Sequence, residues 1–489
     1  MTMSVPESRR VLQGVGWGLL LLALAALSVN RLAPAHLNAD VLLQSVMSLQ
    51  RVTLFYWGQN RLMNFLPLLL QGIRDPQLNL YALLGLAALA HHAWLLALAH
   101  GMRELAGAGQ RVSLLALFLL LTALSLGVLR EYELFSLIVW HFEYSLPALL
   151  GLLAFHALRA PALSLWRVLL AGLLLTVALG LNAAVGLPAM ALGIGYGLYQ
   201  RRLPAFLCGY LGLVVLLMLA SLLVSRWRGP SYAGFELGLL GRGLGEVLGN
   251  LAAMFQPAAA GVLLVAFALG GLAWQWRGAQ VLKVSAGERL ALPLLVLFAL
   301  GWLVLFAGNT WVAANAFHPR YFTWLLYTGL AVLALLWVHA LAGLQGLAQR
   351  VIAVLAGLFC AYCLHAPAIA LANYPLLQRL DQPALQGHGL YAGEYWQVWP
   401  LVWQELAQGR PALGLAYRGE GNLFAVRAYA AGFWDAGRPL SLFCLQALPE
   451  ECVRQAAHVL GELQLQAQQA QGDNWRLELL PARDGRAGQ

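Results

Sequence analysis

Long apolar runs separated by short polar stretches make up the first three quarters of the chain. The first run, 11–32, would be about 33 Å long as a helix, which is enough to cross a bilayer. It exceeds the apolar region of a usual signal peptide, although Ala33-Pro34-Ala35 has the form of a cleavage site, so we expect a retained helix. Similar runs predict about eleven membrane spans, the others being roughly 78–100, 112–129, 136–158, 167–182, 186–200, 204–225, 249–273, 289–309, 321–342 and 350–373.

The stretch 168–199 decides the topology, because Gly186-Leu187-Pro188 interrupts it. It fits either two short spans or one long kinked helix. With a cytoplasmic N-terminus, two spans place the shorter basic loops inside, where positive charge is favoured. We therefore expect two spans here and a C-terminus outside. The polar outer segments would then be 33–77, 130–144, a Gly-rich loop at 226–248, and 310–320.

The last part of the chain, 376–489, has the mixed composition of a water-soluble domain. Its pattern predicts strands at 413–417 and 440–445 and helices at 395–406 and 450–465. The predicted fold class is a polytopic α-helical membrane protein, of about eleven transmembrane helices, with a small C-terminal α/β periplasmic domain. The predicted domains are a transmembrane catalytic domain, 1–375, and the soluble domain, 376–489.

Composition supports this class. With 61% hydrophobic and 10% charged residues, the chain has too little polar surface for a water-soluble globule of its size. A net charge of +9 would suit a nucleic-acid partner, but the basic residues of the short inner loops explain it, so we expect none. No cysteine and histidine set has zinc-ligand spacing, which argues against a structural metal. Cys444 and Cys452 would be able to form a disulfide if the tail lies outside.

The segment that follows the first span contains the first candidate for chemistry. Asp40 precedes an apolar pattern at helical spacing over 41–55, which predicts an amphipathic helix at the membrane interface. An acidic side chain at this boundary would suit a general base that serves a lipid donor and a polar acceptor. Alternatively, Asp40 is the N-cap of the helix. The residues alone leave both roles open.

The second outer loop carries four further candidates. Glu131 and Glu133 would lie on one side of an extended segment and could share a divalent cation or bind a sugar hydroxyl. The alternative is a surface ion pair with Arg130. Glu143 lies within an apolar run, where an ionised carboxylate is costly unless it is paired or hydrated, so Glu143 and His141 form a candidate site. A structural pair with an arginine is the alternative.

A late outer loop, 315–322, supplies basic candidates. Arg320 and His318 would be charge-assisted donors for a lipid phosphate, with Arg61 as a third. Interfacial anchoring by arginine and tyrosine is the alternative. In the tail, the aromatic segment 394–400 suits either a sugar platform or a packing face, and we expect packing.

Several of these features together resemble the GT-C superfamily of membrane glycosyltransferases. They are an acidic residue directly after the first span, an amphipathic helix behind it, about eleven spans and an outer C-terminal domain. The resemblance implies that Asp40 is the general base that activates the acceptor. The motif at 131–133 is similar to the acidic-x-acidic motif of the oligosaccharyltransferase branch, with Glu at both ends here. The resemblance also implies that His318 and Arg320 bind the donor phosphate.

The implied function is transfer of one sugar, with a pentose such as arabinofuranose among the candidates, from a polyprenyl-phosphate donor to a periplasmic glycan, lipid or protein acceptor. The location would be the bacterial inner membrane. No Gly-rich phosphate loop joins a strand to a helix, so we expect no nucleotide-sugar site. No cofactor is required, and nothing beyond the paired glutamates supports a divalent cation. The alternatives are a lipid-linked saccharide transporter or flippase, and an O-antigen polymerase or ligase.

Overall fold

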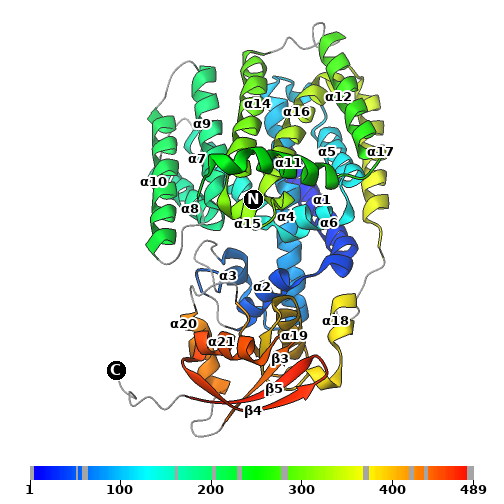
Figure 1. The fold of residues 1–489 in the computed structure, drawn as a ribbon. Coiled ribbons are helices and arrows are strands. Elements are labelled where there is room, and N and C mark those ends of the chain that lie inside the picture. The colour runs from blue at the N-terminus through cyan, green and yellow to red at the C-terminus, as the bar shows by residue number, and fades with distance from the viewer. Residues whose placement is uncertain are drawn as a thin grey trace. The chain divides into compact units, whose positions relative to one another are not determined.

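The chain is mostly helical and forms two compact units in the computed structural model (Figure 1). The structure describes residues 5–50, 53–57, 64–159, 164–200, 205–227, 234–276, 285–366, 374–417, 423–433 and 439–481. Unit 1 comprises Met1–Leu32, Gly85–Arg226 and Pro230–Pro367. Unit 2 comprises Ala33–Leu84, Trp227–Gly229 and Ala368–Gln489. The early segment that contains Asp40 therefore belongs to the same unit as the tail.

Among the residues that the structure describes, unit 1 consists of helices and two isolated β-bridges, Leu129 with Phe255 and Phe235 with Asn309. The helices that lie wholly or mostly in it are α1 (Val5–His36), α4 (Pro76–Leu105), η1 (Gly109–Arg111), α5 (Leu114–Val128), α6 (Glu131–Leu134), η2 (Phe135–Trp140), α7 (Phe142–Arg159), α8 (Leu165–Leu181), η3 (Ala183–Val185), α9 (Gly186–Gln200), α10 (Ala205–Trp227), α11 (Leu237–Ala253), α12 (Ala259–Trp276), α14 (Ala286–Ala307), α15 (Thr310–Ala314), η4 (Pro319–Phe322), α16 (Thr323–Ala342) and α17 (Gly346–Leu364). Serine side chains begin two of them, because Ser113 caps α5 and Ser285 forms a capping box with Glu288 at α14.

The predicted class is confirmed as a mostly helical fold with several apolar spans and a small C-terminal sheet domain, whereas the count of about eleven spans stays a prediction. Among the described residues, five helices are long and apolar enough to cross a membrane, and a pair bent by 48°, Glu131–Trp140 with Phe142–Arg159, allows a sixth. Further apolar helices are shorter, with 10–17 residues. Each of the eleven predicted segments contains a helix. The stretch 168–199 forms two helices, α8 and α9, which are separated at Asn182 and η3.

One predicted loop of unit 1 is wrong. The Gly-rich segment 226–248 was expected to be irregular, but from Leu237 onwards it forms α11. Its glycines permit close packing, since a Cβ on Gly243 would lie 2.1 Å from the carbonyl oxygen of Ala307 on α14. The low helix propensity of glycine is therefore overcome by tertiary contact.

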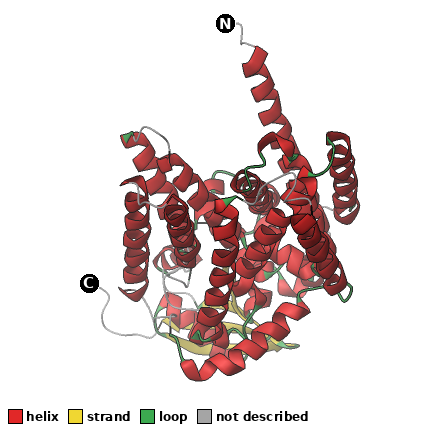
Figure 2. Cartoon of the chain, turned by 90° about the horizontal axis from the view of Figure 1, so that it is seen from above, coloured by secondary structure: helices red, strands yellow, loops and turns green. Residues whose placement is uncertain are grey.

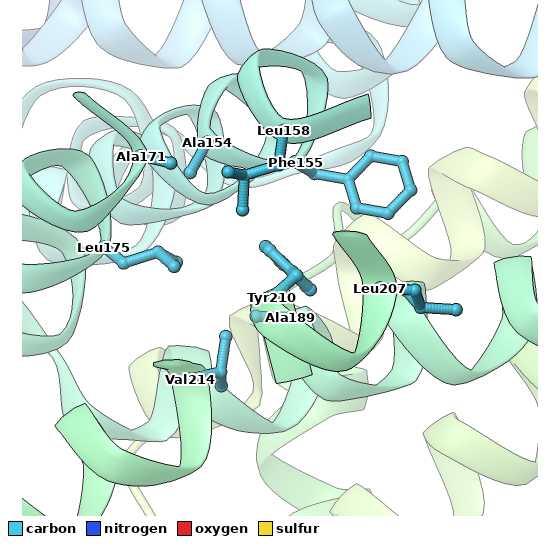
Figure 3. Close-up of a cluster of buried hydrophobic side chains, with 9 residues drawn as sticks. All are labelled: Ala154, Phe155, Leu158, Ala171, Leu175, Ala189, Leu207, Tyr210 and Val214. Carbon is cyan, nitrogen blue, oxygen red and sulfur yellow. The ribbon is translucent and has the colours of Figure 1, made fainter. Parts of the chain in front are cut away.

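An apolar cluster joins α7, α8, α9 and α10. Figure 3 shows Phe155, Leu175 and Val214 around Tyr210, whose side chain is fully buried and whose ring centroid lies 5.3 Å from that of Phe155. The hydroxyl of Tyr210 has no hydrogen-bond partner among the described residues. The neighbours drawn around it are all apolar. This part of unit 1 is therefore a dry core held together by side-chain packing.

Unit 2 combines one sheet with helices, and Figure 2 shows the strands confined to that sheet. The helices are α2 (Ala39–Leu49), α3 (Phe65–Leu70), α18 (Pro375–Leu380), η6 (Pro383–Leu385), α19 (Tyr395–Ala407), α20 (Phe424–Ala430), η7 (Ala431–Phe433) and α21 (Pro449–Leu460). The strands are β1 (Leu390–Gly393), β2 (Leu413–Gly414), β3 (Leu440–Leu445), β4 (Leu463–Gln471) and β5 (Asn474–Pro481). Their order is β2-β1-β3-β5-β4, with β1 parallel to β2 and β3 and the remaining pairs antiparallel.

Within unit 2, α2 packs against α19 of the tail. The helix expected over 41–55 ends at Leu49, and nearly all of its residues are buried. Trp403 of α19 donates a hydrogen bond of 3.2 Å from Nε1 to Ser45 of α2. The helix α2 is buried on its polar side as well because α19 packs against it. The sequence of α2 alone does not reveal this contact.

The tail is an α/β domain as predicted, but its last helix was assigned too long. Gly461, with a φ of +91°, ends α21 at Leu460, and the Gln-rich segment that follows is strand β4. Glutamine and alanine favour helices, which explains the error. The possible pair Cys444 and Cys452 forms a disulfide between β3 and α21.

Candidate functional site

The late loop of unit 1 is held in a conformation that few residues adopt. Ala316 and Phe317 both have φ near +50°, in the left-handed region that non-glycine residues avoid. The side-chain amide of Asn250 on α11 donates hydrogen bonds to both of their carbonyl oxygens, at 3.1 and 3.0 Å. These contacts stabilise the strained turn that leads into His318.

His318 is fixed in orientation and protonation. Its Nδ1 accepts a hydrogen bond of 3.2 Å from the backbone N–H of Arg320, so a neutral ring carries its proton on Nε2. Burial lowers the pKa of His318 to about 4, helped by the charge of Arg320 and by His141. The imidazole is therefore neutral near pH 7 and presents Nε2–H as a donor.

Arg320 lies half-buried in η4, just before α16. Its guanidinium donates a hydrogen bond of 2.9 Å to the hydroxyl of Tyr321 and lies 4.9 Å from the centre of that ring. The backbone is held by Thr323, whose hydroxyl donates to the Arg320 carbonyl, and by Trp302, whose indole donates to the Tyr321 carbonyl. Only one of the five guanidinium donors thus has a hydrogen-bond partner among the described residues.

The structure brings a second predicted pair to the same cluster. His141 Nδ1 lies 2.7 Å from Oε1 of Glu143, and its ring stacks on Trp140 at 4.1 Å between centroids. Glu143 interacts electrostatically with Arg320, and His141 does so with His318. We name these four residues, His141, Glu143, His318 and Arg320, the Arg320 cluster. The alternative of a structural pair between Glu143 and an arginine is only partly met, since the nearest partner of Glu143 is His141.

The two earlier glutamates do not form the extended pair that was expected. Glu131 and Glu133 lie in the short helix α6, and Glu131 forms a two-pronged ion pair with Arg31 of α1, at 2.7 and 3.0 Å. Arg130 donates a hydrogen bond to the carbonyl of Phe255 and also interacts electrostatically with Glu133, so the alternative of an ion pair with Arg130 is met only in part. Side chains two positions apart on a helix do not face each other, so the two carboxylates are not placed to share a cation. In the described part of the chain, no three histidine, cysteine or acidic side chains group as metal ligands would.

An apolar cavity of about 250 Å³ lies in unit 1 beside α16. Leu325 and Leu326 line it, within two helical turns of Arg320. Side chains from α5, η2, α11 and α12 form the other walls, and none of the described residues that line it is charged. A cation followed by an apolar cavity suits a ligand with an anionic head and a hydrocarbon tail.

Asp40 lies in unit 2, at the start of α2, and it is not the N-cap. Asn38 caps the helix, because its side chain accepts a hydrogen bond from the backbone N–H of Val41. Asp40 is half-buried in the first turn, where the helix dipole favours its negative charge. The alternative role of Asp40 as the N-cap is therefore wrong. Arg61 lies outside the described residues.

Tyr395, the first residue of α19, contacts Asp40. Its hydroxyl donates a hydrogen bond of 2.5 Å to Oδ1 of the aspartate. Gln455 of α21 holds the strand that precedes α19, because its amide exchanges two hydrogen bonds with the backbone of Gly393. Sequence reasoning grouped Tyr395 with aromatic packing residues and missed this contact. No local signal points to it, since the partners lie at opposite ends of the chain.

Unit 2 also has a polar cleft of about 510 Å³. Five amide side chains line it, together with Arg379 and Asp473, and its floor includes leucines of α18. The backbone of Gln446 at its edge has a φ of +47° and donates its N–H to the side chain of Asn474. The amides are Gln382, Gln397, Gln446, Gln471 and Asn474. Such a lining offers both donors and acceptors with little net charge.

Comparison with known proteins gives a likeness of architecture. No protein-family model matches the chain, and no curated protein sequence matches it. The chain is similar to the crystal structure of ArnT from Cupriavidus metallidurans bound to undecaprenyl phosphate, with 14% identity, a TM-score of 0.47 and coverage of 95% of this chain and 98% of that chain. The apo structure of the same protein gives 14% identity, a TM-score of 0.45 and coverage of 96% and 98%. A likeness at this level says nothing about substrate.

Proposed function

We propose that this membrane protein is a glycosyltransferase that uses a sugar carried on a polyprenyl phosphate. The observation that carries the proposal is the Arg320 cluster together with an uncharged cavity of about 250 Å³, whose lining begins at Leu325 of the helix that follows Arg320. Arg320 and the Nε2–H of His318 supply donors for a phosphate, and the leucine-lined cavity accommodates part of the isoprenoid tail. The predicted third donor for the phosphate is Arg61.

The reaction joins an acceptor hydroxyl to the anomeric carbon of the donor sugar. The new bond forms from the hydroxyl oxygen, and the bond between the anomeric carbon and the phosphate oxygen breaks, so that polyprenyl phosphate leaves with the electron pair. Asp40 takes the hydroxyl proton as general base. Two observations support this assignment: Asn38, and not Asp40, caps α2, and Tyr395 donates a hydrogen bond to Asp40. Arg320 stabilises the charge that grows on the departing phosphate.

A second candidate for the base is His141. Glu143 holds Nδ1, while Nε2 of His141 is buried and has no hydrogen-bond partner among the described residues. A carboxylate that orients a histidine in this way leaves the far nitrogen free to accept a proton. Comparing Asp40→Asn with His141→Gln in one assay distinguishes the two, because only the true base loses its rate when the donor remains bound.

The acceptor we propose is a glycan, and the amide-lined cleft of unit 2 is its binding surface. Amides hydrogen-bond sugar hydroxyls, and the leucine floor suits the apolar face of a sugar ring. Gln397 lies two residues after Tyr395, so the cleft and the Asp40 contact share the first turn of α19. A pentose such as arabinofuranose stays our prediction for the transferred sugar.

We place the protein in the bacterial inner membrane, with its N-terminus in the cytoplasm and unit 2 in the periplasm. The disulfide of unit 2 supports this orientation, since such bonds persist in oxidising compartments. Labelling of a cysteine at Gln468, an exposed position of β4, by a membrane-impermeant reagent tests it. Labelling that requires permeabilisation would reverse the orientation.

The decisive experiment identifies the lipid and its fate. Mass spectrometry of lipid co-purified with the protein should reveal a polyprenyl phosphate or its glycosylated form. Protein in nanodiscs should then release polyprenyl phosphate from the sugar-linked lipid only when acceptor is present. A flippase would move the same lipid between leaflets and leave the bond between sugar and phosphate intact, which would overturn the proposal.

A further inference from the structure

A group of polar side chains lies inside unit 1, on three of its long helices. His91 and Trp94 come from α4, Ser145 from α7, and Trp324 and Tyr327 from α16. The ring centroids of His91 and Tyr327 are 6.3 Å apart, and those of Trp94 and Trp324 are also 6.3 Å apart. The three helices therefore direct these side chains to one place inside the bundle.

These side chains carry polar atoms that protein contacts do not satisfy. His91 is completely buried, and neither ring nitrogen has a hydrogen-bond partner among the described residues. The same holds for Nε1 of Trp94 and of Trp324, the hydroxyl of Tyr327 and the hydroxyl of Ser145. A buried polar atom in hydrocarbon is destabilising if it stays unpaired, so a cluster of such atoms indicates a hydrogen-bonding occupant.

The group is continuous with other polar residues at both ends. The hydroxyls of Tyr327 and Ser145 lie close to each other but fall short of hydrogen-bond geometry, and Tyr327 interacts electrostatically with Glu143 of the Arg320 cluster. The rings of His91 and His92 are 5.5 Å apart, and Nε2 of His92 lies 3.0 Å from the hydroxyl of Ser28 on α1. Polar atoms thus extend from Glu143 to α1 through the interior of unit 1.

We propose that ordered water occupies this group and bridges His91, Tyr327 and Ser145, forming a hydrated core behind Glu143. Water fits the atoms present, because hydroxyl and imidazole groups both donate and accept while the indoles only donate. Two to four polar partners suffice to hold one buried water. Hydration would also explain how Glu143 is accommodated within a bent apolar span. This inference is independent of the proposed transfer reaction.

The packing residue Tyr210 provides a matched contrast. Its hydroxyl is also buried and unpartnered, but the cluster around it in Figure 3 is apolar, so a water there would have one partner only. Removing a hydroxyl from a dry site relieves an unpaired group, whereas removing one from a hydrated site deletes a hydrogen bond. The same substitution should therefore have opposite signs at the two positions.

Two measurements on the full chain in nanodiscs test the hydrated core. In X-ray radiolytic footprinting, hydroxyl radicals formed from bound water should oxidise Trp324 at least tenfold faster than Trp399. Both side chains are buried, at 5% and 0% exposed, but the indole N–H of Trp399 is bonded to the carbonyl of Ala416. Oxidation of Trp324 no faster than that of Trp399 would overturn the proposal. This result needs no variant.

The second measurement is thermal unfolding of two variants. Tyr327→Phe should lower the melting temperature by a few degrees, and Tyr210→Phe should leave it unchanged or raise it. A rise for Tyr327→Phe would mean a dry core and would also overturn the proposal. If Tyr327→Phe fails to fold, footprinting of the parent protein decides.

Discussion

The hydroxyl of Tyr395 donates a hydrogen bond of 2.5 Å to Asp40, although 355 positions separate the two residues. The contact lies within unit 2, where α19 of the tail packs against α2. A carboxylate fixed by a neighbouring hydroxyl loses fewer rotamers when a substrate arrives, which favours a working geometry. The tail therefore helps to form the environment of the proposed base.

Replacing Asp40 by Asn should abolish transfer while leaving the fold intact. Asn has no basic oxygen at neutral pH, and loss of a positioned general base lowers a rate by about a hundred- to ten-thousand-fold. Single-turnover transfer in nanodiscs measures this, with thermal unfolding alongside. The matched control is Asn38→Ala, which removes the real cap of α2 and should cost about 1 kcal/mol of stability without a comparable loss of rate. A rate above about a tenth of the parent in Asp40→Asn would move the base to His141 or to a glutamate.

Arg320→Ala should weaken binding of the lipid-linked donor. Loss of a charge-assisted partner for a phosphate costs about 2–3 kcal/mol, or roughly 30- to 150-fold in affinity. The control is Arg350→Ala, which changes the net charge equally at an exposed position of α17. Affinities are compared by titration of polyprenyl phosphate into nanodiscs. Parent-like affinity in Arg320→Ala, within twofold, would remove Arg320 from the phosphate site.

Acid should destabilise the protein through His318. The pKa of this ring is about 4 in the folded protein against 6.5 for an ordinary histidine, so the unfolded state binds more protons between these values. Stability contributed by the neutral ring is complete above pH 6.5 and is lost as the pH falls toward 4. Thermal unfolding between pH 4 and pH 7 should therefore show a smaller acid-induced decrease in His318→Gln than in the parent. Identical slopes would mean that His318 does not control this range.

Reduction of the disulfide should destabilise unit 2. A cross-link over a separation of 8 residues removes unfolded-state entropy equivalent to about 2–3 kcal/mol. Cys444→Ser with Cys452→Ser should lower the unfolding temperature of unit 2 and abolish its sensitivity to reductant. Cys208→Ser serves as the control, since Cys208 is a free, exposed thiol of α10. A parent protein that reductant leaves unaffected would contradict the prediction.

Helix positions in unit 1 were predictable because apolar run length is a local property. The boundary at Gly186 and the strand at 440–445 were also found from local signals. The helix α11 was not predicted. Gly243 is needed there because the backbone of α14 lies close to it, and the local sequence does not reveal that contact. Strand β4 was missed because its residues favour helices and only pairing with β5 makes it a strand.

For the candidate site, too, the sequence identified individual residues but not the contacts between distant segments. His318, Arg320, His141 and Glu143 were chosen separately for their chemistry, and the structure adds that they form one cluster. The role of Asp40 was left open between general base and N-cap, and the observed cap at Asn38 excludes the N-cap role. The partners Arg31 and Tyr395 could not be predicted, because they come from distant segments and from contacts that depend on the assembled helices.

The assembly of unit 2 from the two ends of the chain has a consequence for biosynthesis. At about 5–20 residues per second, a ribosome needs roughly 15–60 s to extend the chain from Leu84 to Ala368. Throughout that interval α2 exists without α19, so Val46 and Met47, which are fully buried in the finished unit, have no tail to cover them. Apolar surface uncovered for so long promotes aggregation, and the membrane surface or a chaperone must shield it. Translation that stops before the tail would leave α2 without the helix that covers it.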